Sequence, residues 1–316
     1  MTIAIDRELG WLMLGALIAL VCASIAGLVL SRRAASGARK ATIANLNDRI
    51  RAWWVMCAVI ALAVLAGKPG AVVLFAALSF LALREFITLV PIHHGDHRAL
   101  LYLFFIVTPV QYWLVYREWY GLFVVFIPVY AFLLLPARAA MAGDTSDFLV
   151  RTAAIQWALM ICVYCVSHAP ALLLLDLPGY AGENAKLLLF LVIVCEGSDV
   201  FQYVWGKLFG TRKIAPVVSP NKTWEGFLGG IASATVLGAV LWWATPFAPW
   251  QAALMALVIA LMGFAGGLTM SAIKRDRGVK DFGGLIAGHG GVLDRIDSLC
   301  FAAPVFFHLT RYFWHG

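Results

Sequence analysis

The sequence contains few charged residues. Asp, Glu, Lys and Arg make up 13% of its 316 residues, whereas hydrophobic residues make up 62%. A soluble globular domain typically has about a quarter charged residues. The scarcity of charge therefore excludes an ordinary soluble domain. Apolar runs of roughly 17–25 residues, the length that crosses a bilayer, recur along the chain. We predict an all-α, polytopic integral membrane protein.

Other features are also missing. No long basic tract or basic-aromatic platform is present, so the net charge of +7 does not indicate nucleic-acid binding and is assigned to loops at a membrane surface. The six cysteines lie in or beside apolar runs, and the Cys162–Cys165 pair has no accompanying His or second CxxC. We interpret them as packed thiols and not as metal ligands or redox centres.

About ten transmembrane helices are expected. The first apolar run follows a segment without net positive charge and is interpreted as a retained span, not a cleaved signal peptide. The predicted spans are residues 9–31, 52–67, 70–90, 99–116, 119–136, 152–175, 186–205, 227–244, 250–270 and 298–313.

The orientation is predicted from Lys and Arg in short loops. The loop from Arg32 to Arg51 is rich in arginine and is placed in the cytoplasm. Alternation then places the loops at 207–222 and 274–295 on the cytoplasmic side and both termini outside. These two loops contain the motifs described below. We therefore divide the single membrane domain into N-terminal transmembrane helices, 1–180, and a C-terminal catalytic region, 181–316.

The first polar cluster lies at the end of the seventh predicted span. Glu196, Asp199 and Tyr203 follow each other at spacings of three and four residues, which places them on one helix face. Two carboxylates on one face are suited to a divalent cation, although solvation of a helix end at the membrane surface explains them equally well.

The next segment is Ser219–Gly226, with the sequence SPNKTWEG. Pro220 disfavours helix at Ser219, so we predict that a helix begins near Thr223, with Thr223 as its N-cap and Gly226 allowing close approach. A helix N-terminus beside Lys222 can bind phosphate. An ordinary capped loop remains the alternative.

The densest polar cluster is the glycine-rich segment 271–297. Ionisable residues are costly at membrane depth and mark a functional site. Asp294 and Asp297 are one helical turn apart and are candidate metal ligands, and Lys274, Arg275 and Lys280 are candidate phosphate ligands. Snorkelling charges at the membrane surface explain so dense a set poorly.

This segment resembles the signature of the CDP-diacylglycerol synthase (phosphatidate cytidylyltransferase) family. The matching residues in it are Ser271, Lys274, Arg275, Lys280, Asp281, Gly283, His289, Gly290, Gly291, Asp294, Arg295 and Asp297. A second family motif is matched by Asp199, Tyr203, Gly206, Lys207, Ser219, Pro220, Lys222, Thr223, Glu225 and Gly226. The tetrapeptide 83–86 resembles a further short family motif, and the rest of residues 1–180 agrees only in hydropathy.

The resemblance implies transfer of CMP from CTP to phosphatidate at the cytoplasmic face of the inner membrane, in a multi-pass protein that forms a homodimer. It implies Mg²⁺, with Mn²⁺ as the alternative and a monovalent ion as a second cation. The implied catalytic residues are Lys274, Arg275, Asp281, His289, Asp294 and Asp297. The implied substrate-binding residues are Ser219, Lys222, Thr223, Lys280 and Arg295. The implied metal ligands are Glu196, Asp199, Asp294 and Asp297.

One departure from the family pattern affects the metal site. Gly267 stands where the family usually carries an acidic residue, and we expect Glu196 to take over its role. Two other functions stay open: a relative that uses another lipid phosphate or nucleotide, and a non-catalytic transporter or lipid-binding protein, which the lost acid favours and the retained Lys274 and Asp294 oppose.

Overall fold

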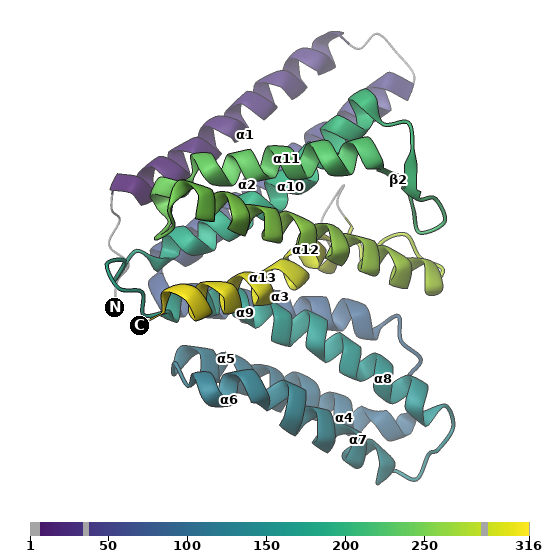
Figure 1. Cartoon of the computed structure of the whole chain (residues 1–316). Helices are drawn as coiled ribbons and strands as arrows, with labels where there is room; N and C mark the ends of the chain where they lie inside the picture. The colour runs from purple at the N-terminus through teal and green to yellow at the C-terminus, as the bar shows by residue number, and fades with distance from the viewer. Residues whose placement is uncertain (1–6, 34–37, 286–289, 316) are drawn as a thin grey trace.

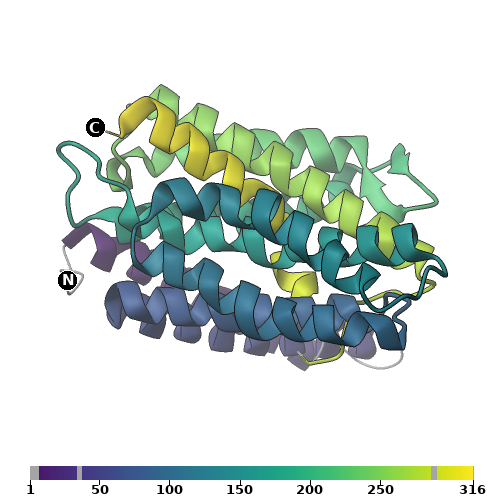
Figure 2. The ribbon, with the colours of Figure 1, turned by 90° about the horizontal axis from the view of Figure 1, so that it is seen from below.

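The computed structural model describes residues 7–33, 38–285 and 290–315. These residues are almost entirely helical, and the long helices lie side by side (Figures 1 and 2). Figure 1 shows both ends of the chain at one end of the molecule and the β-hairpin at the opposite end. The protein is thus all-α and polytopic, as the sequence predicted.

Up to Leu174 the elements are α1 (Arg7–Arg33), α2 (Ala38–Leu65), α3 (Gly67–Ile87), the 3₁₀ turn η1 (His94–Asp96), α4 (His97–Tyr102), the π-helical η2 (Leu103–Val107), α5 (Thr108–Tyr116), α6 (Tyr120–Val125), the π-helical η3 (Phe126–Ala131), α7 (Phe132–Ala140), α8 (Phe148–Leu159), the π-helical η4 (Met160–Cys165), α9 (Val166–Ala171) and the 3₁₀ turn η5 (Leu172–Leu174). After Leu174 they are α10 (Asn184–Phe209), β1 (Lys213–Ala215), β2 (Ser219–Thr223), α11 (Trp224–Val240), the 3₁₀ turn η6 (Trp242–Ala244), α12 (Pro249–Asp276) and α13 (Leu293–Trp314).

Seven helical segments in the described ranges are long and apolar enough to cross a membrane, and α11 is a shorter apolar helix. The other two predicted spans, in α2 and α13, are helical but do not meet that criterion. Helix α2 begins at Ala38, so much of the expected loop 32–51 is helical. Arg151, which directly precedes the predicted span 152–175, lies in α8 and is buried.

Small residues bring the C-terminal helices close together. A Cβ atom at Gly230 of α11 would lie 2.7 Å from the backbone nitrogen of Gln202 in α10. A Cβ atom at Gly266 of α12 would lie 2.6 Å from the carbonyl oxygen of Asp297 in α13. Side chains larger than hydrogen are therefore excluded at both positions, and the backbones of neighbouring helices pack directly.

The described residues between α12 and α13, 277–285 and 290–292, return the chain into the molecule. Helix α12 extends to the end that carries the β-hairpin, whereas α13 begins in the interior (Figures 1 and 2). Buried non-helical backbone needs protein groups to satisfy its hydrogen bonds. The side chains that do so here belong to Glu85 and Asp294.

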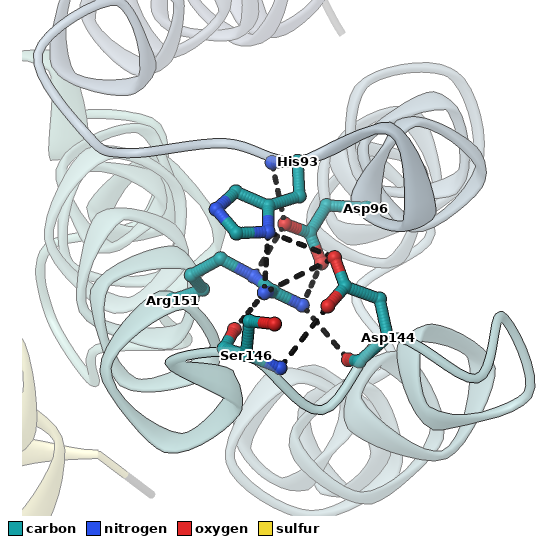
Figure 3. Close-up of polar contacts among 5 residues, drawn as sticks. All are labelled: His93, Asp96, Asp144, Ser146 and Arg151. Atoms are coloured by element: carbon teal, nitrogen blue, oxygen red, sulfur yellow. Dashed lines mark hydrogen bonds and ion pairs between the residues drawn. The ribbon is translucent and has the colours of Figure 1, made fainter.

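A buried ion pair joins α8 to η1, the turn that follows α3. Arg151 Nε lies 2.9 Å from Asp96 Oδ2, and both side chains are almost completely buried. The same guanidinium contacts Asp144 and His93 (Figure 3). The hydrogen bond with the His93 ring is the largest cause that lowers the pKa of Asp144 to about 2. Asp144 therefore stays ionised, and the cluster connects α8 to the segments that follow α3 and α7.

Candidate active site

Glu85 of α3 supports the start of α13. Its carboxylate oxygens accept hydrogen bonds from the backbone nitrogens of Val292, at 3.0 Å, and Leu293, at 2.9 Å. Helix N-termini leave such N–H groups without intrahelical partners, and a carboxylate there also interacts favourably with the helix dipole. Glycines lie close to this carboxylate on both sides. A Cβ atom at Gly283 or Gly291 would lie 2.6 or 2.3 Å from a Glu85 oxygen, so a side chain there would displace the carboxylate.

Asp294 holds the folded-back segment in place. Its Oδ1 accepts a hydrogen bond from Lys274 Nζ at 2.7 Å, in a pair whose side chains are 11% and 2% exposed. Its Oδ2 accepts hydrogen bonds from the backbone nitrogens of Phe282, at 2.8 Å, and Gly291, at 2.9 Å. Asp294 therefore connects α12, the folded-back segment and α13.

Asp199 and Asp297 approach each other around Ser298. The Ser298 hydroxyl donates to Asp199 Oδ2 at 2.7 Å, and its backbone nitrogen donates to Asp297 Oδ1 at 2.8 Å. Within the described ranges, no hydrogen bond to the other oxygen of either carboxylate is present. Sequence reasoning did not select Ser298, because a serine inside a helix carries no distinctive signal.

Lys222 supplies positive charge next to these carboxylates. Its Nζ lies 4.4 Å from the centre of the Phe264 ring, a cation–π contact. Burial lowers the pKa of Lys222, while the charges of Asp199 and Asp297 oppose that effect. The lysine is thus held in a partly desolvated position where an anion would be bound strongly.

Gly267 faces the same place. A Cβ atom built on it would lie 3.2 Å from Lys222 Nζ, 3.6 Å from Ser298 Oγ and 4.0 Å from Asp297 Oδ2. An acidic side chain at this position would therefore belong to the same carboxylate group. The glycine leaves that group with one acid fewer.

The hairpin of β1 and β2 positions Ser219, Lys222 and Thr223. The strands are antiparallel, with Lys213 opposite Thr223. Helix α11 begins directly after Thr223, whose hydroxyl accepts a hydrogen bond from Gly226 N at 3.2 Å. The predicted N-cap is confirmed. Close approach at Gly226 is also confirmed, since a Cβ atom there would lie 2.8 Å from the Gln202 carbonyl oxygen.

A cavity of about 390 Å³ opens between α2, α10, the hairpin, α12 and α13. It brings together five predicted site residues, namely Asp199, Ser219, Lys222, Thr223 and Arg295. Arg49 of α2 and Asn221 also line it and were not predicted as site residues. Arg49 was assigned to an arginine-rich loop, and nothing in its local sequence sets it apart from its neighbours.

Other predicted residues lie elsewhere. Arg275, near the end of α12, and Lys280, after it, are both exposed. Arg275 donates a hydrogen bond to the Val279 carbonyl oxygen at 3.0 Å. Asp281 is exposed but adjoins the Asp294 region, because a Cβ atom at Gly290 would lie 3.1 Å from Asp281 Cβ. His289 lies outside the described residues.

The described ranges contain no group of three or more His, Cys, Asp or Glu side chains arranged as a metal site. Glu196 nevertheless interacts electrostatically with Asp199, Asp297 and Arg295. Carboxylate oxygens are the ligands that Mg²⁺ prefers. The Asp199–Asp297 pair fits a divalent cation that keeps several waters and also binds substrate phosphates.

The chain is similar to known proteins. The model of the "Cytidylyltransferase family" matches residues 47–313. The uncharacterized protein YnbB of Escherichia coli is 42% identical over 268 residues, which is 84% of this chain and 87% of YnbB. A phosphatidate cytidylyltransferase of Mycobacterium leprae is 37% identical over 172 residues, or 54% of this chain and 53% of that protein. One of Pseudomonas aeruginosa is 44% identical over 123 residues, covering 38% and 45%.

The long apolar helices and the charged residues that line the cavity define a multi-pass membrane protein with a polar site between its helices. The chain belongs to the cytidylyltransferase family, and so to the nucleotidyltransferase enzymes. Its matches to the two phosphatidate cytidylyltransferases span about half of their length.

Proposed function

We propose that this protein transfers CMP from CTP to phosphatidate and releases pyrophosphate. The observation that carries the proposal is the cavity in which Lys222, Arg295 and Arg49 lie beside the carboxylate of Asp199. Cations bind the phosphates of both anionic reactants, and carboxylates bind the metal that neutralises them. The named relatives and the matching motifs support the same reaction.

In the proposed reaction a phosphate oxygen of the lipid bonds to the α-phosphorus of CTP. The bond from that phosphorus to the α,β-bridging oxygen breaks, and this oxygen leaves as part of pyrophosphate. Phosphatidate is already ionised, so no residue has to remove a proton. Catalysis then consists of positioning and charge neutralisation. A bound divalent cation would supply part of that charge.

The chain's own residues divide this work. We assign Asp199 and Asp297 to the cation, with Glu196 one helical turn away. Lys222 and Arg295, which both line the cavity, bind phosphates. Lys274 donates a hydrogen bond to Asp294, and we assign this pair to positioning the segment that precedes α13.

The cavity and both motif segments face the cytoplasm of the inner membrane in this proposal, because CTP is found there and the Arg32–Arg51 segment is rich in arginine. A cysteine introduced as Thr211→Cys tests the orientation. We expect a membrane-impermeant thiol reagent to label it only after the cells are lysed. Labelling in intact cells would overturn the assignment.

The activity is tested with purified protein, Mg²⁺ and CTP labelled at either the α- or the γ-phosphate. With phosphatidate we expect the α-label in the lipid and the γ-label in pyrophosphate. Diacylglycerol, which lacks the phosphate, and the Asp297→Asn variant serve as controls without product. Transfer of the γ-label to lipid would indicate a kinase. The absence of labelled product from phosphatidate, with product from another lipid phosphate, would assign a different substrate.

A further inference from the structure

A second cavity, about 480 Å³ in volume, lies between α1, α2 and α10. Its lining is apolar and includes Leu17 of α1, Cys57 and Ala61 of α2, and Leu189 and Ile193 of α10. None of its lining residues is charged. We call it the apolar groove. It is not part of the polar site described above.

Helix α1 forms one side of this groove. The family match begins at residue 47, so α1 is an addition to the matched region. Glu8 of α1 pairs with the buried Lys186 of α10 at one end of the helix. Towards its other end, Trp54 Nε1 of α2 donates to Ser24 Oγ at 3.0 Å. These two contacts hold α1 over the groove, although most of its surface is exposed.

The groove and the polar cavity follow each other along the same two helices. On α2, Arg49 lines the polar cavity and Trp54 lines the groove. On α10, Asp199 lines the polar cavity and Ile193 lines the groove. On each helix these positions are about one and a half turns apart, and Glu196 lies between the two α10 positions.

We propose that the apolar groove binds an acyl chain of the lipid phosphate whose head group occupies the polar cavity. This proposal rests on the proposed function, since it takes a lipid phosphate as substrate. Such a lipid has an anionic head group, which matches the cations of the polar cavity. Its apolar chain matches the apolar groove that follows. Helix geometry places Ala61 about 18 Å along α2 from Arg49, so a long chain reaches Ala61 and a short chain does not.

The test fills the groove at that depth with Ala61→Trp. The control is Leu62→Trp, because Leu62 is adjacent on α2 but 67% exposed and outside the groove. We measure CMP transfer to dipalmitoyl and to dioctanoyl phosphatidate. For Ala61→Trp the KM for dipalmitoyl phosphatidate should rise on the order of tenfold or more. The KM for dioctanoyl phosphatidate and the kcat for both lipids should stay close to those of the unchanged protein, as should all values for Leu62→Trp.

Binding provides a readout that does not depend on turnover. Native mass spectrometry of the detergent-purified protein compares retention of the two lipids. Retention of dipalmitoyl phosphatidate should fall in Ala61→Trp and in Ala16→Trp, which fills the groove from α1 and replaces Ala61→Trp if that variant does not fold. Equal effects on both lipids, or no effect on either, would overturn the groove assignment. Selective retention by a protein that transfers no CMP would refute the proposed function and leave the groove assignment standing.

Discussion

Asp294 and Asp297 lie one turn apart on α13 but should respond oppositely to the same substitution. Asp294 accepts hydrogen bonds from Lys274 and from two backbone nitrogens. Asparagine has only one acceptor oxygen and places an NH₂ group against one of these donors. Breaking a buried ion pair costs about 3–5 kcal/mol, because the remaining charge is left uncompensated. We expect Asp294→Asn to lower the free energy of unfolding by about that amount.

Substitution of Asp297 should leave the stability of the protein almost unchanged. Asp297 lies beside Asp199 around Ser298, so two half-buried carboxylates are close together. Asparagine keeps an acceptor for the Ser298 nitrogen and removes the repulsion between like charges. We expect Asp297→Asn to change the free energy of unfolding by less than about 1 kcal/mol or to raise it. Its CMP transfer should fall on the order of a hundredfold or more, since the stabilisation of the transferring phosphate is lost.

The assay combines unfolding of each detergent-purified variant with its rate of CMP transfer. The assignment requires a destabilised Asp294→Asn and a stable but inactive Asp297→Asn. An Asp294→Asn variant as stable as the unchanged protein would show that its hydrogen bonds do not hold the segment before α13. A strongly destabilised Asp297→Asn would show that Asp297 is part of the structural framework, and near-normal activity would exclude it from metal binding.

Three further outcomes are expected. Gly267→Asp should lower the Mg²⁺ concentration needed for half-maximal CMP transfer. The Cβ of the new aspartate would lie 3.2 Å from the flexible end of Lys222 and face the Asp199–Asp297 pair. An unchanged Mg²⁺ dependence would refute this. Glu85→Ala should destabilise the protein by about 1–3 kcal/mol for each backbone N–H left without an acceptor, as measured by thermal unfolding, and a neutral effect would contradict its capping role. Arg151→Ala should cost about 3–5 kcal/mol in the same measurement, whereas the exposed Arg98→Ala should not, and equal melting of the two variants would rule out the buried pair as a stabilising contact.

The local features of this protein follow from its sequence. Apolar runs predict the helical spans because a bilayer core needs such lengths. The N-cap at Thr223 follows from a proline followed by a capping residue. Both are interactions between neighbours in the chain, and spacing along the sequence is enough to predict them.

Only the tertiary structure places residues that are distant in the sequence around one site. Glu85 meets the start of α13 from 207 and 208 residues away, and Arg49 lines the same cavity as Lys222. Spacing alone placed Asp294 and Asp297 on one helix face, but packing gave Asp294 a lysine and Asp297 a second carboxylate. The sequence determined which residues carry charge in an apolar chain. The tertiary structure decided their partners, because a buried charge is stabilised by whichever groups neighbouring helices bring to it.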